Sequence, residues 1–499
     1  MTGFVTSPWR TGVANPPKKF YHFVRLWTPH AWWSWVLAAR VPAATRRAGR
    51  LPNDRSWRAV HEMSSATYDA RPVDRSRISG FTPFERYMFI ISICLLYLSD
   101  QILENLGIPY GSAQGNPLTK LHPCAYFLFA AFFSVLFRQR FYRVAALNPH
   151  AMIFAYVMIA ITLIQGLLKG EGQLTNYIFS FIVPAIYVTL FPLLSEREQK
   201  LIFKITIAFY VVNSLTGLAE LVTGRHLFTL YLDGVPFDEV RSTAFGGHPL
   251  SNALNTAFAG LIAFAYLRNL IVKVFCVLVM LASQLAFQGR VATVMMLIGL
   301  AALVGHSLLR MAQGQRISSS NFLFGFAGVF VGPLLGIYVA FGTSLGESFL
   351  SRFADDNGSA STRIGSIDII NLMTWEEKII GASPSRGFDM QSFMGLIYGI
   401  ENMWVSLFFK FGLLLFIPFC IVFFLFLRGV VRRHSFVSLV CTMVLIVGLS
   451  SSVGLSTKSS LLSLFCVMMM SGATYARRPE RISYAEFYGL DDDEAAVGN

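Results

Sequence analysis

Long runs of apolar residues, separated by short polar connections, dominate the chain. A helix needs about 20 mostly apolar residues to cross a bilayer, and about twelve runs approach that length. These runs lie near residues 87–105, 121–137, 150–168, 176–195, 200–222, 250–267, 270–288, 291–309, 321–342, 402–427, 436–453 and 457–474. The pattern predicts an all-α polytopic membrane protein with about 12 transmembrane helices and a large periplasmic loop between spans nine and ten.

Positive charges follow the alternation that membrane topology requires. With a cytoplasmic N-terminus, every even-numbered connection is also cytoplasmic, and cytoplasmic connections carry an excess of Lys and Arg. The even-numbered connections and the tail include Arg138, Arg140, Arg143, Arg268, Lys273, Arg310, Arg316, Arg428, Arg432, Arg433, Arg477, Arg478 and Arg481. The charges therefore predict that both termini are cytoplasmic.

This topology divides the chain into three regions. They are a basic cytoplasmic N-terminal extension at 1–85, a membrane domain at 86–475 with periplasmic loops 223–249 and 343–401, and a cytoplasmic tail at 476–499. Within the extension, the aromatic segment Trp27–Val41 has two interpretations, an interfacial helix or part of a disordered basic tail. The two periplasmic loops are the only predicted outer segments large enough to build a site.

Composition agrees with a membrane as the main partner. The chain is 54% hydrophobic and only 14% charged, which is more apolar than an ordinary soluble domain. Its net charge of +13 does not indicate nucleic-acid binding, because Lys and Arg are spread over short connections between apolar runs. The expected partner is the lipid bilayer, with no nucleic acid.

Several charged or polar residues lie at the predicted outer ends of spans, where the positive-inside rule gives no reason for a cation. Arg290, in QGR, stands at the outer end of a helical hairpin and is either functional or a snorkelling or ion-paired side chain. The other candidates are Arg363 in STRIGSIDI, Arg241 and His248 in VRSTAFGGHPLSN, and Glu401 and Asn402 before MWVSLFFKFG. Arginine forks hold phosphate bidentately, so this group indicates a lipid-linked phosphate or diphosphate.

A carboxylate near such a site could accept a proton from a hydroxyl group as a general base. The segment after Arg363 offers a possible apolar stripe of Ile367, Ile370, Met373 and Trp375. A stripe of this kind more often packs on the membrane domain than contacts a ligand.

Four segments carry a resemblance to a known family: RSTAFGGHPLSNAL, QGRVATVMMLIGL, STRIGSIDIINLMTWEEKIIGAS and ENMWVSLFFKFGLLLF. They resemble, in order, the His-Pro-Asn-like loop, the Ser-Arg-Gly hairpin, the arginine before an amphipathic helix, and the His-Asn motif of the O-antigen ligase and Wzy-type polysaccharide polymerase superfamily. Glu401 stands where the ligases have their proposed catalytic histidine. This departure favours a polymerase over a ligase.

The resemblance implies a polymerase of exopolysaccharide, capsule or O-antigen repeat units, by metal-independent inverting glycosyl transfer from undecaprenyl diphosphate, with no cofactor. The implied location is the inner membrane of a bacterial cell. The implied catalytic residues are Glu401, Arg290 and Arg363, and the implied substrate contacts are Arg241, His248 and Asn402. The implied partners are the undecaprenyl-diphosphate-linked glycan, the growing polysaccharide acceptor and a chain-length regulator.

Two alternatives remain open. A ligase would transfer finished glycan to a lipid core. A transporter or flippase would place charged residues near the membrane midplane in related halves. Here nearly all candidates lie at outer ends, with Lys410 and Glu220 as exceptions.

Overall fold

The computed structural model describes part of the 499-residue chain, and this part is mostly helical. The described residues are 80–108, 110, 120–139, 141–169, 174–232, 235–237, 241–314, 359–395, 400, 402–431, 436–451 and 454–476. The segment Trp27–Val41, nearly all of the N-terminal extension, the predicted span 321–342 and the tail after Ala476 lie outside them.

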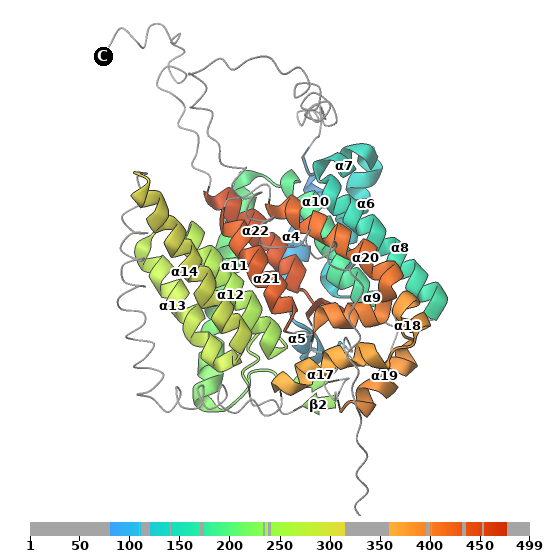
Figure 1. Cartoon of the computed structure of the whole chain (residues 1–499). Helices are drawn as coiled ribbons and strands as arrows, with labels where there is room; N and C mark the ends of the chain where they lie inside the picture. Colours follow the sequence, from blue (N-terminus) through green and yellow to red (C-terminus); the bar gives the residue numbers. More distant parts are fainter. Residues whose placement is uncertain are drawn as a thin grey trace, which may run out of the picture. The chain divides into compact units, whose positions relative to one another are not determined.

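Helices of ten or more residues form most of this part (Figure 1). They are α4 (Pro83–Leu96), α6 (Pro123–Arg138), α8 (Pro149–Lys169), α11 (Glu196–Thr223), α12 (Pro249–Tyr266), α13 (Leu270–Phe287), α14 (Arg290–Ala312), α17 (Ser359–Leu372), α19 (Pro384–Phe393), α20 (Met403–Val431), α21 (Phe436–Leu449) and α22 (Leu461–Ala476).

Shorter elements connect or extend these helices. They are α5 (Asp100–Asn105), α7 (Phe141–Leu147), α9 (Leu174–Tyr177), the π-helix η4 (Ile178–Ile182), α10 (Val183–Leu190), the 3-10 helix η5 (Phe191–Leu193), α18 (Trp375–Ile380), the 3-10 helix η6 (Gly454–Ser456), and strands β1 (Leu230–Leu232) and β2 (Val235–Phe237). The two strands pair antiparallel, with Leu230 opposite Phe237. The segment from α9 to η5 forms one continuous helical stretch.

Within the described ranges, six helical segments are long and apolar enough to cross a membrane. They are Pro149–Leu167, Leu174–Leu193, Glu196–Thr223, Leu270–Phe287, Arg290–Ala312 and Met403–Val431. Large apolar side chains on these helices are exposed, including Leu167 at 85% and Ile271 at 79%. Lipid is the natural solvent for such surfaces. The protein is therefore an all-α membrane protein, and the total of twelve spans stays a prediction.

Every predicted span within the described residues overlaps a helix or a continuous helical segment. The first span is predicted as one unbroken run at 87–105, but the structure divides it. Helix α4 ends at Leu96, and Ser99 starts α5 by accepting a hydrogen bond from the Ile102 N–H at 3.4 Å. The residues from Ser99 to Asn105 are therefore a separate short helix rather than the end of a span.

Capping boxes set the starts of several helices. In α4 the Thr82 N–H donates to Glu85 at 2.8 Å, while the Glu85 N–H donates to the Thr82 hydroxyl at 3.3 Å. The same reciprocal pattern joins Ser195 to Glu198 at the start of α11. Each box satisfies two backbone or side-chain donors that an uncapped helix would leave without a partner.

Helix α12 lies at the centre of the packing and is buried on nearly all sides. It packs against α13, α14, α21 and α22. Small residues permit this close approach: a β-carbon on Gly260 would lie 2.4 Å from Met296 Cε, and one on Gly299 would lie 2.8 Å from a methyl carbon of Leu261. Packing of small against large side chains is a main source of helix association in membranes.

Helix α20 is broken at Gly412, whose φ of 62° and ψ of 175° lie outside the helical range. The carbonyl groups beside the break find other donors. The Ala382 N–H donates to Phe409 O at 2.9 Å, and Lys169 Nζ donates to Lys410 O at 2.5 Å. Irregular backbone inside a membrane protein needs such replacement bonds. The predicted single span 402–427 is therefore two helical segments joined at Gly412.

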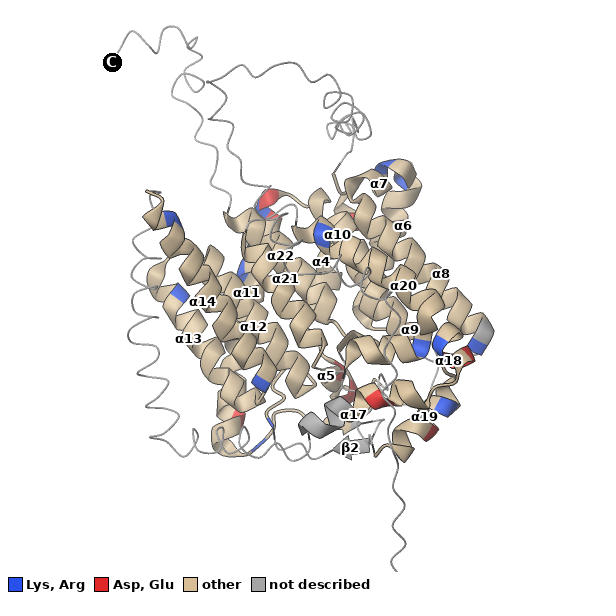
Figure 2. Cartoon of the chain, viewed as in Figure 1, with Lys and Arg blue, Asp and Glu red and all other residues tan. Residues whose placement is uncertain are grey.

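Charged residues gather toward the ends of the long helices (Figure 2). At one end, Arg138 forms an ion pair with the buried Glu85 at 2.7 Å, and Arg86 lies 3.2 Å from Glu198. These pairs join the start of α4, the end of α6 and the start of α11. The chain direction therefore alternates as the span order requires.

The opposite end carries α5, the β-hairpin, α17, α18 and α19 (Figure 1). We call this the loop end, and it also includes 223–232, 241–249, the turn between α13 and α14, and 454–460. Helix α5 packs against β1, and α17 and α18 pack against α20. The loop end is the one that the charge pattern predicts to be periplasmic.

The predicted apolar stripe on α17 is only partly correct. Met373 is buried, but Ile367 and Trp375 are 52% and 77% exposed. Ile369, which was not in the stripe, is fully buried and packs with Met373. Ile370 also packs against this cluster, so two of the four stripe residues pack toward α20 together with Ile369, while Ile367 and Trp375 do not.

Candidate functional site

A buried carboxylate holds the loop that carries Arg241 and His248. Glu220, in the last turn of α11, is 5% exposed. One of its oxygens accepts from the Ser242 hydroxyl at 2.6 Å and from the N–H groups of Thr243 at 3.1 Å and Ala244 at 3.0 Å.

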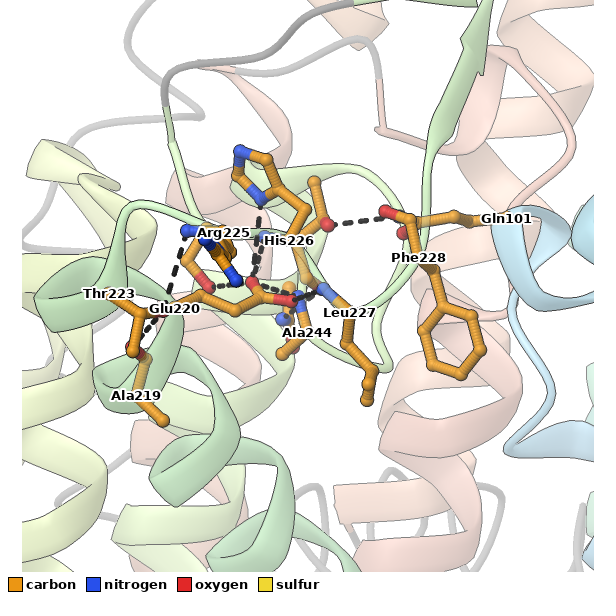
Figure 3. A network of polar contacts seen from close by, with 12 residues as sticks. Gln101, Ala219, Glu220, Thr223, Arg225, His226, Leu227, Phe228 and Ala244 are labelled. Carbon is orange, nitrogen blue, oxygen red and sulfur yellow. Dashed lines mark hydrogen bonds and ion pairs between the residues drawn. The ribbon is translucent and has the colours of Figure 1, made fainter.

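The other Glu220 oxygen accepts from the Leu227 N–H at 2.7 Å, and His226 Nδ1 lies 3.6 Å from the first oxygen (Figure 3). Glu220 thus joins both arms of the connection between α11 and α12. Glu220 is an exception in the sequence pattern because it does not lie at the predicted outer end of a span. In the structure it lies in the last turn of α11, and its hydrogen bonds anchor the loop that follows.

Two asparagines, one on α11 and one on α12, hold the same loop by hydrogen bonds. Asn213 donates to Asn252 Oδ1 at 2.8 Å and accepts from the Phe245 N–H at 3.1 Å. Asn252 donates in turn to Thr243 O at 3.0 Å. A β-carbon on Gly246 would lie only 2.3 Å from Asn252, so glycine is needed for this approach. Asn252, in the HPLSN run of the sequence, therefore shapes the loop.

The structure brings the segments of Arg241, His248 and Arg290 together. The Ser242 N–H, next to Arg241, donates to Ala286 O at 3.1 Å, just before the turn that ends at Arg290. Arg241 and Arg290 are half-buried, and His248 is exposed as the N-cap residue of α12. Arg290 is the first residue of α14.

Close packing fixes the turn that presents Arg290. A β-carbon on Gly289 would lie 2.4 Å from Ala253 Cβ in the first turns of α12, so a side chain cannot be placed there without movement. Gln288 has a left-handed backbone with φ of 52°, which is uncommon for a residue other than glycine. The turn and the 241–249 loop therefore form one connected surface.

The remaining predicted site residues are described less fully. Arg363 lies in α17, and its side chain is outside the described part, as is Glu401. Asn402 caps α20 by accepting from the N–H groups of Trp404 at 3.0 Å and Val405 at 3.3 Å. The structure thus links the segments that carry Arg241 and Arg290 through a backbone hydrogen bond, and it gives Asn402 a capping role.

Lys410 is the other exception among the charged candidates, and it has a partner. Its Nζ donates to Ser456 O at 3.0 Å, which connects α20 to η6 at the loop end. A backbone carbonyl therefore accounts for the position of this cation without a role in chemistry.

Three further polar residues meet beside the loop: Asp100, Tyr110 and Lys458, here called the α5 cluster. Lys458 Nζ donates to Tyr110 O at 2.8 Å and lies 4.5 Å from the centroid of the Tyr110 ring. Gly247 has a φ of 74°, and a β-carbon there would lie 2.3 Å from Asp100 Oδ1. The α5 cluster therefore adjoins the 241–249 loop.

The charges of this cluster influence one another. Asp100 as a whole residue is exposed. Desolvation by the surrounding protein nevertheless raises the pKa of its carboxyl group, and the positive charge of Lys458 acts in the opposite direction. Desolvation and the nearby charge of Lys120 lower the pKa of Lys458 to about 8, against the opposing charges of Asp100 and Glu104. Both groups thus titrate closer to neutrality than usual.

The apolar pattern hides this cluster because Asp100 falls inside the predicted first span and Lys458 inside the predicted last one. Two features of the sequence could have revealed this cluster. A charge inside an apolar run is costly in a membrane and marks a site or a wrong boundary. Ser99 before Asp100 is also a typical helix start.

The loop end thus offers two arginine-bearing segments, an exposed histidine and a separate mixed-charge cluster. This combination can bind an anionic group at one place and a hydroxyl-bearing group at another. Comparison of the chain with protein-family models, with curated proteins and with solved structures found no match.

Proposed function

We propose that the protein polymerises lipid-linked polysaccharide repeat units by inverting glycosyl transfer at the loop end. The proposal rests on the resemblance of four sequence segments to the polymerase and ligase superfamily. The observation that carries it is the hydrogen bond from the Ser242 N–H to Ala286 O, which holds the segments of Arg241 and Arg290 side by side. Two arginines so placed suit a diphosphate.

In this proposal Arg290 and Arg363 bind the diphosphate of the lipid-linked donor. Their guanidinium groups would stabilise the negative charge that develops on the leaving oxygen. Arg241 and His248 would line the same site, and Asn402, as the cap of α20, would position the neighbouring Glu401. Apolar side chains on the adjacent helices would face the polyprenyl chain.

The transfer step balances without a further reactant. A hydroxyl oxygen of the acceptor sugar attacks the anomeric carbon of the donor from the face opposite the diphosphate. The new C–O bond forms while the bond to the diphosphate breaks, and the diphosphate keeps the electron pair. Glu401 would receive the proton of the attacking hydroxyl as a general base.

A ligase that transfers finished glycan to a lipid core would use the same chemistry with a different acceptor. Glu401, in place of the ligase histidine, favours the polymerase. Glycans that accumulate after deletion of the protein distinguish the two: single lipid-linked repeat units support a polymerase, whereas long unligated chains support a ligase.

The direct test compares two alanine variants of one helix. Arg290 begins α14 at the loop end, and Arg310 lies in its last turn at the opposite end. We expect Arg290→Ala to abolish polymer formation and Arg310→Ala to preserve it, with both proteins at normal level in the membrane. Arg290→Lys should restore little, because lysine lacks the planar fork. Full polymer yield from Arg290→Ala would remove Arg290 from the mechanism.

A further inference from the structure

The α5 cluster contains buried hydrogen-bonding groups with unused capacity. Tyr110 is 2% exposed, and its hydroxyl has no partner among the described residues. The neighbouring Gln101 is 1% exposed, and its Oε1 is likewise without a donor in the described part of the chain. Buried polar atoms are normally hydrogen-bonded, so the Tyr110 hydroxyl, in a residue that interacts with Asp100 and Lys458, is a candidate contact for a ligand.

Asp100 adds an open acceptor to this group. Its carboxylate accepts from the Gln101 N–H at 2.9 Å, and within the described ranges no side chain donates to it. Asp100 as a residue keeps exposed surface, although one carboxylate oxygen lies close to Gly247, so a ligand would reach it from the exposed side. Lys458 is half-buried, and after its bond to Tyr110 O its ammonium group has further donors to offer.

The charge balance of the cluster selects the class of ligand. Lys120, Asp100 and Glu104 all lie near enough to Lys458 to influence its pKa, so the cluster holds two cations and two carboxylates. The carboxylates would repel an anion such as diphosphate, and the lysines would repel a cation. A neutral group with adjacent hydroxyls satisfies all of these residues, because each hydroxyl both donates and accepts.

We propose that the α5 cluster binds a neutral sugar residue of the glycan. One sugar hydroxyl donates to Asp100, while the Tyr110 hydroxyl and Lys458 donate to neighbouring sugar oxygens. The inference rests on the proposed function and deepens it. It assigns the sugar to the α5 cluster and the diphosphate to the segments of Arg241 and Arg290, which adjoin the cluster through Gly247.

Protection of a cysteine from labelling tests the proposal. Thr457 is exposed and precedes Lys458, so Thr457→Cys places a thiol beside the cluster. The exposed Cys94 is replaced by serine to remove background labelling. The full-length protein, in nanodiscs, is treated with a small maleimide in the presence of short neutral oligosaccharides cut from the host's surface polysaccharide, or of inorganic diphosphate.

We expect the oligosaccharides to slow labelling and diphosphate to have no effect. Asp100→Asn or Tyr110→Phe should raise the oligosaccharide concentration needed for protection roughly tenfold or more, because the first replaces a charged acceptor with a weaker neutral one and the second removes a donor to the sugar. The matched control Asp389→Asn, an exposed carboxylate on α19, should leave protection unchanged.

Absence of protection by the oligosaccharides, equal protection by diphosphate, or unchanged protection in both Asp100→Asn and Tyr110→Phe would overturn the inference. These outcomes are separate from failure of the proposed function. If polymer still forms after deletion of the protein while the oligosaccharides still protect the thiol, the polymerase proposal fails and the sugar site stands. If Arg290→Ala forms no polymer and the thiol is not protected, the sugar site fails alone.

Discussion

Glu220 is the residue whose replacement should most directly loosen the candidate site. Its two oxygens accept four hydrogen bonds, from Leu227, Ser242, Thr243 and Ala244. Glu220→Gln keeps one carbonyl oxygen and replaces the other with an NH₂ donor. If that oxygen serves Leu227, the N–H groups of Thr243 and Ala244 face another donor. If the amide turns over, the Leu227 N–H loses its acceptor.

The first arrangement leaves two buried backbone donors without an acceptor, and the second loses the partly buried bond from Leu227; each buried loss costs about 1–3 kcal/mol. We expect Glu220→Gln to reduce the free energy of opening of the 241–249 loop by about 2–4 kcal/mol. Every 1.4 kcal/mol is about tenfold in an equilibrium constant, so amide exchange should accelerate roughly thirty- to a thousandfold. Hydrogen exchange of peptides from 241–249, followed by mass spectrometry in nanodiscs, measures this change.

The matched control is Glu196→Gln at the other end of α11. Glu196 has a 55% exposed side chain and an ion pair with Lys200 at 2.6 Å. Exposed pairs of this kind contribute about 0–1 kcal/mol, so exchange in 241–249 should stay as in the unmodified protein. If Glu220→Gln and Glu196→Gln give the same exchange in this loop, Glu220 does not anchor it.

Three other predictions concern the break in α20, the α5 cluster and the topology. Gly412→Ala should lower the folded yield and the thermal stability, because its β-carbon would lie 2.3 Å from Gly381 N. Gly305→Ala should be tolerated, because nothing lies within 4 Å of its β-carbon. Equal thermal stability of the two variants would contradict this prediction. With its pKa lowered to about 8, Lys458 should lose its proton above that pH, so an amine reagent should label it at a lower pH than an ordinary lysine. A cysteine in 355–361, but not one in 138–143, should react with an impermeant thiol reagent added outside the cell, and the reverse result would invert the topology.

The helices of the membrane domain were predictable because a bilayer imposes a simple local rule. A run of apolar residues long enough to cross it must satisfy its own backbone, and only a helix does this within one segment. The pattern therefore located α8, α11, α13 and α14 to within a few residues. It also identified Arg290 as a cation at an unexpected end of its helix.

The neighbours of Arg290 were not predictable by the same means. The 241–249 loop contacts the α13–α14 turn through the hydrogen bond from the Ser242 N–H to Ala286 O. The turn also packs against the start of α12, where Gly289 lies against Ala253. No local pattern encodes such tertiary contacts. The resemblance to a family grouped these segments by analogy, and the structure supplies a physical contact between two of them.

The two places where the hydropathy pattern misleads have a common cause and a common location. Averaging over an apolar run conceals a single polar or flexible residue, so Asp100 was included in a span and Gly412 was placed inside an unbroken helix. The structure divides the first run at Ser99 and breaks the second at Gly412, where Gly381 of the loop end packs into the gap. Departures from local rules in natural proteins often mark functional or strained sites. Both departures lie at the loop end, on the side that carries Arg241 and Arg290, and this agreement favours the loop end as the place where substrate binds.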